Sequence, residues 1–497
     1  MCQCDFSEWQ APLPSQSQFE MTAVGHGVFP NRENCVDPLT IRKLQVRLLP
    51  LLFLLYVIAW IDRINVGFAA LTMNKELGIA SEQFGFAAGI FFLGYFLFEV
   101  PSNLLLHKIG ARIWITRILV TWGILATLTG GVRTIHQLYF MRFLLGLAEA
   151  GYFPGMILYL TRWFPRRERA QAFALFMVAG PVSKIIGSPI SGFILDHIHW
   201  LGLSGWRWLL MLEGAPAIAC GLLTYILLPS RPEEARFLSA AENECLQRVL
   251  HHEEDQKLMN HNYSVFQTFV NGRVWYFAVV NLGVLIGKYA LDFWAPQLLK
   301  SVSGEQSNTV IGFIAAIPHV AGLIAMVLVS QSSDRRMERR RHAALPAMLG
   351  GFSLLLMGSF HSPVILIALL SLLAMGVYSW AGPFWALPSE FLTGSSAAAG
   401  IAIINSIASL GGFVGPWVIG VMSIWVGGAY GALAITGIPL LVSAASLLFV
   451  SGRLKVDNIK REHSRRIANR SEMNAGAFLR YAAARQAAAD DDSGVTI

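Results

Sequence analysis

The chain has 497 residues, of which 54% are hydrophobic and only 14% are charged, and its mean hydropathy is +0.51. A soluble domain usually carries about 25% charged residues, so this composition excludes an ordinary soluble globular protein. The net charge of +7 does not require a nucleic-acid partner, because Lys and Arg beside apolar spans are typical of a cytoplasmic membrane face.

Apolar segments follow one another in chain order as about twelve candidate membrane-spanning helices. Each is long enough to cross a hydrocarbon core of about 30 Å. The first six lie near residues 47–71, 84–106, 113–133, 136–163, 170–195 and 206–228. The second six lie near residues 273–299, 308–330, 343–360, 362–388, 397–425 and 430–451. We therefore predict an all-α membrane protein with two pseudo-symmetric six-helix bundles.

The polar segments divide the chain into five parts. These are an N-terminal tail at 1–46, a bundle at 47–228, a charged linker at 229–272, a second bundle at 273–452 and a C-terminal tail at 453–497. Lys and Arg gather in alternate loops, whereas the intervening loops have few cations. By the positive-inside rule, this pattern predicts that both termini are cytoplasmic.

Two features indicate that the bundles repeat one unit. The loop "DRRMER" (334–339) begins 227 residues after the loop "HKIGAR" (107–112), and the pair Gly415/Gly420 follows the pair Gly187/Gly192 at an offset of 228. A same-direction repeat of six helices predicts two bundles around a site near the middle of the membrane. A chance match between short basic loops is the alternative.

The chain resembles the major facilitator superfamily. Within it, the chain resembles the anion:cation symporter family of organic-anion/proton permeases, such as transporters of tartrate, phthalate, hydroxyphenylacetate and sugar acids. The similarity covers about residues 45 to 450. The family's basic loop usually has a carboxylate where this chain has His107, and Gly where it has Met337. The stretches that carry the resemblance are "DRINVGFA" (62–69), "VPSNLLLHKIGAR" (100–112), "RFLLGLAEAGYFPGMILYLTRWFP" (142–165), "GWRWLLMLEGAP" (205–216), "FWAPQLLKS" (293–301), "SDRRMERRRHAALP" (333–346) and "GPFWALPSEFLTGSSAAAGIAIINSIASLGGFVGP" (382–416).

Two adjacent charges, Asp62 and Arg63, lie within the apolar first span. An ionisable group at bilayer depth is costly unless it is paired or faces water, which makes such a group a candidate for function. The two side chains point about 100° apart around a helix, so each needs its own partner. The resemblance implies that Asp62 carries a proton and that Arg63 faces the anion. Static ion pairs between helices are the alternative.

The fourth span carries Arg142 and Glu149, seven residues apart. This spacing places both on one helix face, about 10 Å apart along the axis, so that a charged ligand or a group from another helix fits between them. The planar fork of Arg142 suits a carboxylate, and the apolar neighbours of Glu149 favour its protonated form. We predict that Arg142 binds substrate and Glu149 couples protons. An Arg142 that only packs is the alternative.

Lys184 lies in the middle of the fifth span, where relatives of the family more often have a small or neutral residue. A buried lysine needs an anionic partner, and we expect this to be a substrate carboxylate, Asp62 or Glu149. The alternative is a snorkelling or structurally paired lysine.

Three further residues are secondary candidates. Lys288 and Asp292 are four residues apart on the seventh span and can pair directly; the pair either holds the helix or forms a second charged site. His319 in the eighth span titrates near neutral pH and can serve proton coupling, or it is a hydrogen-bonded core histidine.

Three residues are assigned to substrate binding by the resemblance, which implies that Tyr95, Trp385 and Asn405 line the cavity. Tyr and Trp combine an apolar face with a polar edge, and the Asn amide both donates and accepts hydrogen bonds. Ordinary packing is the alternative for each.

The sequence as a whole predicts a secondary active transporter in the bacterial inner membrane. It would import a small organic carboxylate by proton symport through alternating access. An organic-anion exchanger or exporter, or a transporter-like nutrient sensor that signals through residues 453–497, remains an alternative. We expect no enzyme activity, cofactor, metal ion or nucleic acid. The expected partners are the anion, protons and the lipid bilayer, and the expected carrier is a monomer.

Overall fold

The structure is a computed structural model that describes residues 36–259, 265–389, 392 and 394–449. Every regular element in this part of the chain is helical, which confirms the predicted all-α class. Most of the predicted N-terminal tail at 1–46, and all of the predicted C-terminal tail at 453–497, lies outside the described residues.

The first half of the chain, here called the N half, forms seven α-helices in six membrane-spanning units. They are α1 (Pro38–Leu77), α2 (Ser81–Ile109), α3 (Ala111–Thr129), α4 (Ile135–Glu149), α5 (Tyr152–Trp163), α6 (Arg166–His197) and α7 (Gly205–Leu227), with a short 3-10 helix, η3 (Trp200–Gly202), before α7.

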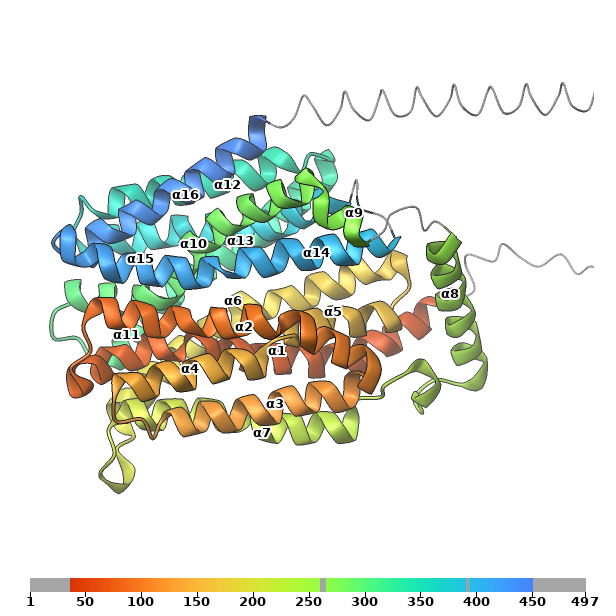
Figure 1. Ribbon diagram of the computed structural model, residues 1–497, viewed down its shortest axis with the longest axis horizontal. Coiled ribbons are helices and arrows are strands. Elements are labelled where there is room, and N and C mark those ends of the chain that lie inside the picture. Colours follow the sequence, from red (N-terminus) through yellow and green to blue (C-terminus); the bar gives the residue numbers. More distant parts are fainter. Residues whose placement is uncertain (1–35, 260–264, 390–391, 393, 450–497) are drawn as a thin grey trace, which may run out of the picture.

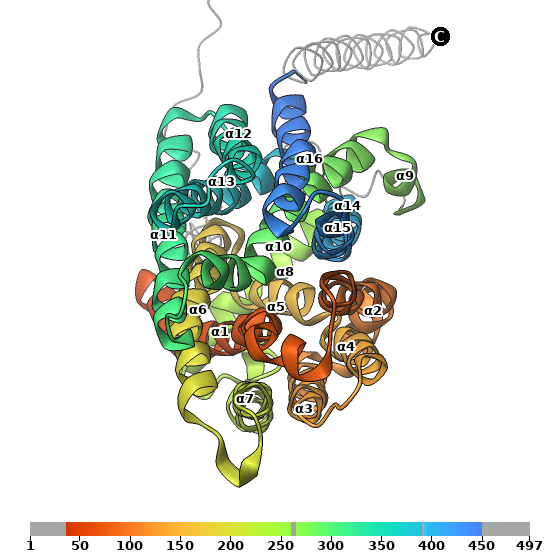
Figure 2. The same cartoon turned by 90° about the vertical axis from the view of Figure 1, so that its left-hand side faces the viewer.

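The second half, here called the C half, also forms seven α-helices in its described part. Its helices are α10 (Gly272–Val302), α11 (Asn308–Arg336), α12 (Arg340–Met357), α13 (Pro363–Ser389), α14 (Gly394–Ser409), α15 (Gly411–Trp425) and α16 (Ala429–Phe449). Here the divided span is the fifth, formed by α14 and α15. The two halves lie side by side, and the view along the helices shows the N half as one bundle and the C half as the other (Figures 1 and 2).

Eleven spans of the described chain are long and apolar enough to cross a membrane. The predicted span that is missing from these eleven is the ninth, at 343–360, which corresponds to α12, an 18-residue helix whose first turn contains Arg340, Arg341 and His342. Those polar side chains lower its apolar character, although α12 packs between α13 and α16 as part of the C half. The fold is therefore that of an integral membrane protein with two six-span bundles.

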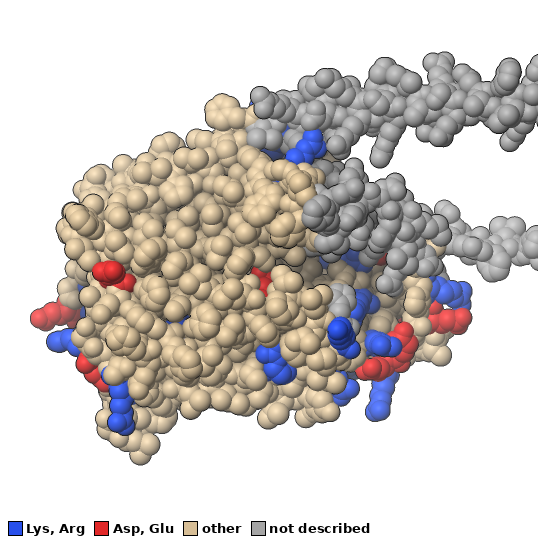
Figure 3. Space-filling view, viewed as in Figure 1, with Lys and Arg blue, Asp and Glu red and all other residues tan. Residues whose placement is uncertain are grey.

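The surface agrees with this assignment. Large apolar side chains such as Phe140, Leu328 and Phe313 are about 60% exposed, as expected for side chains that face lipid. On the visible face, charged side chains gather at the two ends, and few lie between them (Figure 3).

The fourth span is broken immediately after Glu149. Gly151 adopts a left-handed conformation with φ of 83°, and a Cβ atom there would collide with the Ser102 side chain of α2. Only glycine combines this backbone with this contact. The break ends α4 at Glu149 and starts α5 at Tyr152.

The two basic loops of the repeat each contain one residue with a positive φ. Gly110 lies between α2 and α3 with φ of 96°, and Met337, which is 227 positions later, lies between α11 and α12 with φ of 50°. Both loops therefore turn through a positive φ. Met337 makes that turn without the freedom of glycine.

The helices define two ends of the molecule. The loop end carries the connections at 78–80, 198–204, 303–307 and 426–428, at the left of Figure 1. The linker end carries α8 (Ala240–Met259) and α9 (Val265–Val270). At the loop end the halves are in close contact. A Cβ at Gly312 of α11 would collide with the backbone of Ser188 on α6, and one at Gly192 of α6 would collide with Asn308.

The charged linker is largely helical where it is described. It contains a 3-10 helix η4 (Pro232–Glu234), α8 (Ala240–Met259) and α9 (Val265–Val270). Lys43 of α1 donates to Glu242 of α8 at 2.7 Å and lowers the pKa of that exposed carboxyl to about 2. Arg169 of α6 reaches Glu253 of α8 at 3.2 Å. The linker helix is thus attached to the N half.

Candidate functional site

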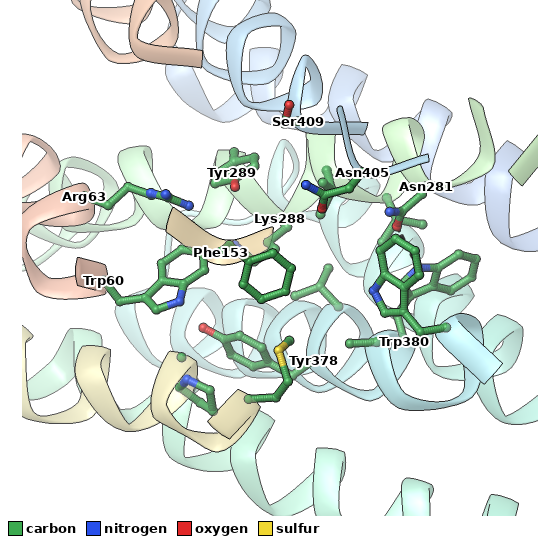
Figure 4. Close-up of a pocket in the computed structure, with 18 of the residues that line it drawn as sticks. Trp60, Arg63, Phe153, Asn281, Lys288, Tyr289, Tyr378, Trp380, Asn405 and Ser409 are labelled. Atoms are coloured by element: carbon green, nitrogen blue, oxygen red, sulfur yellow. Dashed lines mark hydrogen bonds between the residues drawn. The ribbon is translucent and has the colours of Figure 1, made fainter. Parts of the chain in front are cut away.

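A cavity of about 140 Å³ lies between the two halves. Helices α1, α2, α5 and α6 line it from the N half, and α10, α11, α13 and α14 line it from the C half. Figure 4 shows side chains from both halves pointing into this space. Its aromatic lining comprises Tyr56, Trp60, Phe92, Tyr95 and Phe153 from the N half and Tyr289, Tyr378, Trp380 and Trp385 from the C half.

Three cationic side chains line this cavity, and no Asp or Glu is among its described lining residues. Arg63 of α1, Lys184 of α6 and Lys288 of α10 all lie over the Trp60 ring, with their charged groups 4.9, 4.7 and 4.3 Å from its centroid. The negative face of an indole attracts cations, most strongly where water is excluded. Three positively charged side chains, two from the N half and one from the C half, therefore contact the Trp60 ring.

The predicted pair of adjacent charges on the first span has separate partners, as their angular spacing indicates. Arg63 lines the cavity and donates to Glu149, the last residue of α4. Asp62 faces away from the cavity lining and accepts hydrogen bonds from the Trp122 indole and from Asn65, the latter at 3.0 Å. Arg63 is thus part of the cavity wall, whereas Asp62 is bonded to other side chains of the N half.

Arg142 lies deep in the N half, with a relative exposure of 2%. Its guanidinium carbon is 5.1 Å from the Phe91 centroid, and Arg63 covers the same ring at 5.4 Å. Its Nε and Nη2 atoms have no hydrogen-bond partner among the described residues, and neither does Glu149 Oε2. Arg142 interacts electrostatically with Asp62 and Glu149, so these charges form one buried cluster with Arg63.

Lys184 has a partner that the sequence analysis did not consider. It pairs with Asp292 of α10, whereas the expected partners were Asp62, Glu149 or a substrate carboxylate. Asp292 also accepts from Lys288 at 2.8 Å, which confirms the direct pairing expected from their spacing. Each carboxylate oxygen of Asp292 thus faces one lysine.

The remaining predicted substrate-binding residues line the cavity, and one of them also makes a hydrogen bond inside the protein. Tyr95, Trp385 and Asn405 all line the cavity. Asn405 also donates to Glu99 of α2 at 2.9 Å, and Ser406 donates to the other oxygen of Glu99. Glu99 thereby links the two halves.

His319 is a buried histidine in α11. Its Nδ1 lies 3.0 Å from the Tyr378 hydroxyl, and the ring of the same tyrosine contacts Lys184, whose Nζ is 5.3 Å from the Tyr378 centroid. His319 is not among the residues that line the cavity.

Comparison with known proteins identifies the fold family. The model of the Major Facilitator Superfamily matches residues 52–416, which is more than half of the chain. The chain is a member of the Major Facilitator Superfamily.

This superfamily member has relatives at substantial identity. A protein of Agrobacterium vitis proposed to be a tartrate transporter is 43% identical over 84% of this chain and 92% of its own length. A quinolone resistance transporter of Acinetobacter baumannii is 38% identical over 84% of this chain and 95% of its own length. Membership of the superfamily, together with these relatives, shows that the chain is a membrane transporter. This agrees with the resemblance to the anion:cation symporters.

Solved structures support the same fold for this transporter. A bacterial homologue of the human lysosomal transporter Spinster, in an inward-facing and occupied conformation, matches with a TM-score of 0.65 at 16% identity, over 82% of this chain and 97% of that chain.

The sequence analysis missed Trp60 as a central residue of this transporter's cavity. A signal was present, because Tyr56, Trp60 and Arg63 are spaced four and three residues apart and so share one helix face. The same analysis missed Tyr378 and Tyr289, which carry no charge and appear in the sequence as ordinary packing residues.

Proposed function

We propose that the protein imports a small organic anion, a carboxylate, by proton symport through alternating access. The observation that carries this proposal is the cavity lined by Arg63, Lys184 and Lys288 from both halves and by no described carboxylate. Cations at a site between two repeated bundles favour an anionic substrate, and movement of one bundle against the other would expose that site to each side in turn.

The pairing of Arg63 with Glu149 supports a route for proton coupling. While Glu149 is ionised, it competes with substrate for the guanidinium. A proton on Glu149 removes that competition and leaves Arg63 free to donate to a substrate carboxylate. Binding of the proton and of the anion would therefore favour each other, as symport requires.

Asp62 would be a second proton site, acting through Arg142. Its carboxylate is held by Trp122 and Asn65 and lies away from the cavity. A proton on Asp62 removes one of the two carboxylates that attract Arg142, so the Arg142 charge becomes more available to Glu149 or to substrate.

The relative named for tartrate supports a small hydroxylated dicarboxylate as the first substrate to test. We place the linker end and both termini in the cytoplasm of a bacterial cell and the loop end outside, because basic residues concentrate in the linker-end loops. We also propose that the monomer is the transporting unit, since the cavity is formed within one chain.

Purified protein in proteoliposomes tests this function. Radiolabelled L-tartrate should accumulate when the external medium is made acidic relative to the lumen, and a protonophore should abolish the accumulation. Uptake that requires a counter-anion inside and ignores the pH gradient would establish exchange instead.

Export is the second candidate, favoured by the likeness to the quinolone resistance transporter. It predicts that inside-out vesicles accumulate norfloxacin and that tartrate does not compete. Saturable binding of tartrate without any flux in either orientation would support a sensor.

A further inference from the structure

The ion pair between Lys184 and Asp292 crosses from one half of the protein to the other. Lys184 belongs to α6 of the N half and Asp292 to α10 of the C half, and both side chains are at most 1% exposed. Breaking a buried ion pair is costly when neither partner finds a substitute. The halves can therefore separate at this point only if both charges remain compensated.

The pair lies where the cavity meets the closed loop end. Lys184 is the lining residue of α6 nearest to that end, and Asp292 lies one turn beyond Lys288 in the same direction. Beyond Lys184, Ser188 packs directly against Gly312 of α11. Opening of the loop end would separate α6 from α11 and pull Lys184 away from Asp292.

The charges of this cluster are unequal. Asp292 is one carboxylate shared between Lys184 and Lys288, with one oxygen facing each. One positive charge is left over at the cavity surface beside the Trp60 ring. A substrate carboxylate would make the same contacts with these lysines that Asp292 makes.

We propose that Asp292 is an internal counter-ion that takes the place of the substrate carboxylate on Lys184. When the loop end opens, Lys184 leaves Asp292 and binds the arriving anion. When the loop end closes, Asp292 returns to Lys184, displaces the anion toward the linker end and latches the halves together. This inference rests on the proposed anion transport, and it assigns to Asp292 a role in release and in closure.

The closure is tested without any substrate. Spin labels coupled to unnatural amino acids at Leu201 and Glu305, exposed positions in loop-end connections of opposite halves, report their separation by pulsed electron paramagnetic resonance. Asp292→Asn and Lys184→Gln should each shift the distribution to longer distances. The exchange Lys184→Asp with Asp292→Lys keeps the same charges and should restore the short distance.

A buried carboxylate elsewhere supplies the control. Glu213 of α7 is 5% exposed and accepts from Ser191 at 2.7 Å within the N half. Glu213→Gln should leave the label distance unchanged. If Asp292→Asn leaves the distribution as in the wild type, or if the charge exchange stays in the long-distance state, the latch is refuted.

The counter-ion role is tested by equilibrium binding of L-tartrate. Asp292→Asn should tighten binding about tenfold or more, because removal of a competing charge-assisted hydrogen bond frees the lysines for the substrate carboxylate. Asp292→Asn should also tighten binding when it is added to Lys184→Gln, because Lys288 then has no competing carboxylate. This double variant removes one charge of each sign, so the net charge of the protein is unchanged. Unchanged or weaker binding in both backgrounds would overturn the counter-ion role.

The two proposals fail in different ways. If wild-type protein neither binds nor transports tartrate or other small carboxylates, anion transport is refuted, and the label distances still decide whether the ion pair latches the loop end. If tartrate is transported and the distances of all variants match the wild type, transport stands and the latch is wrong.

Discussion

Arg63 of α1 donates to Glu149 at the point where the fourth span breaks. The Arg63 guanidinium, which lines the cavity, is thus held by the carboxylate of Glu149, the last residue of α4 and two positions before the left-handed Gly151. The contact joins a group that faces the cavity to one that is fully buried. Proton coupling is therefore most directly examined at this pair.

Glu149→Gln should abolish proton-driven accumulation of tartrate while counterflow exchange continues. The amide cannot ionise, so it leaves Arg63 permanently available to substrate and removes the competition that a proton relieves. Accumulation and counterflow are measured in the same proteoliposomes. Full accumulation by the variant would remove Glu149 from the coupling mechanism.

Arg63→Lys should weaken tartrate binding by about tenfold or more, although the charge is retained. Lysine is a compact point charge and cannot form the two parallel hydrogen bonds of a guanidinium, and one charge-assisted hydrogen bond contributes ~1.5–3 kcal/mol. Arg142→Lys is the matched comparison and should have a smaller effect on affinity, because Arg142 does not line the cavity. Isothermal titration measures both, and equal losses would place Arg142 in direct contact with substrate.

Trp60→Leu should weaken anion binding by allowing the three cations to move apart. Each cation–aromatic contact contributes roughly 0.5–2 kcal/mol depending on its exposure. Trp60→Phe retains a smaller aromatic face and should show an intermediate dissociation constant. Equal binding by the Leu and Phe variants would show that shape, rather than the aromatic face, is what Trp60 provides.

Met337→Gly should stabilise the protein, because Met337 has φ of 50° and its side chain is 80% exposed. A non-glycine residue in the left-handed region costs about 1 kcal/mol, and the equivalent position in the first half is already Gly110. Thermal unfolding in detergent should move up by on the order of 1–2 °C. Met337→Ala removes the same side chain but keeps the Cβ, so a matching gain there would exclude backbone strain as the cause.

Asp196→Ala should loosen the contact between the halves at the loop end. The Asp196 carboxylate of α6 accepts from the backbone N–H groups of Asn308 and Thr309 at 3.2 and 2.6 Å, and so caps α11 of the other half. Loss of such a cap costs about 0.5–2 kcal/mol. The distance between the loop-end labels should lengthen.

Asp37→Ala is the matched control for Asp196. Asp37 caps α1 through Leu39 at 2.9 Å, entirely within the N half. This variant should lower thermal stability without changing the label distance. A lengthened distance with Asp37→Ala would show that any lost cap loosens the loop end.

Several properties followed from local sequence alone. Apolar length predicted the spans, because each helix must satisfy its own backbone hydrogen bonds in lipid. The spacing of Lys288 and Asp292 predicted their pairing, because residues four apart lie on the same helix face. The adjacent charges of Asp62 and Arg63 predicted separate partners for the same geometric reason.

The sequence by itself therefore determined the membrane location, the number of spans, their repeat and the set of buried charges, since these depend on helix length, composition and spacing within a helix. Only the tertiary structure decided which charges meet. Lys184 and Asp292 are 108 residues apart, and Trp60 has no charge to mark it, yet the approach of α1, α6 and α10 places these side chains in one cluster. Such pairings depend on how two bundles pack against each other, and no periodicity within one helix encodes that arrangement.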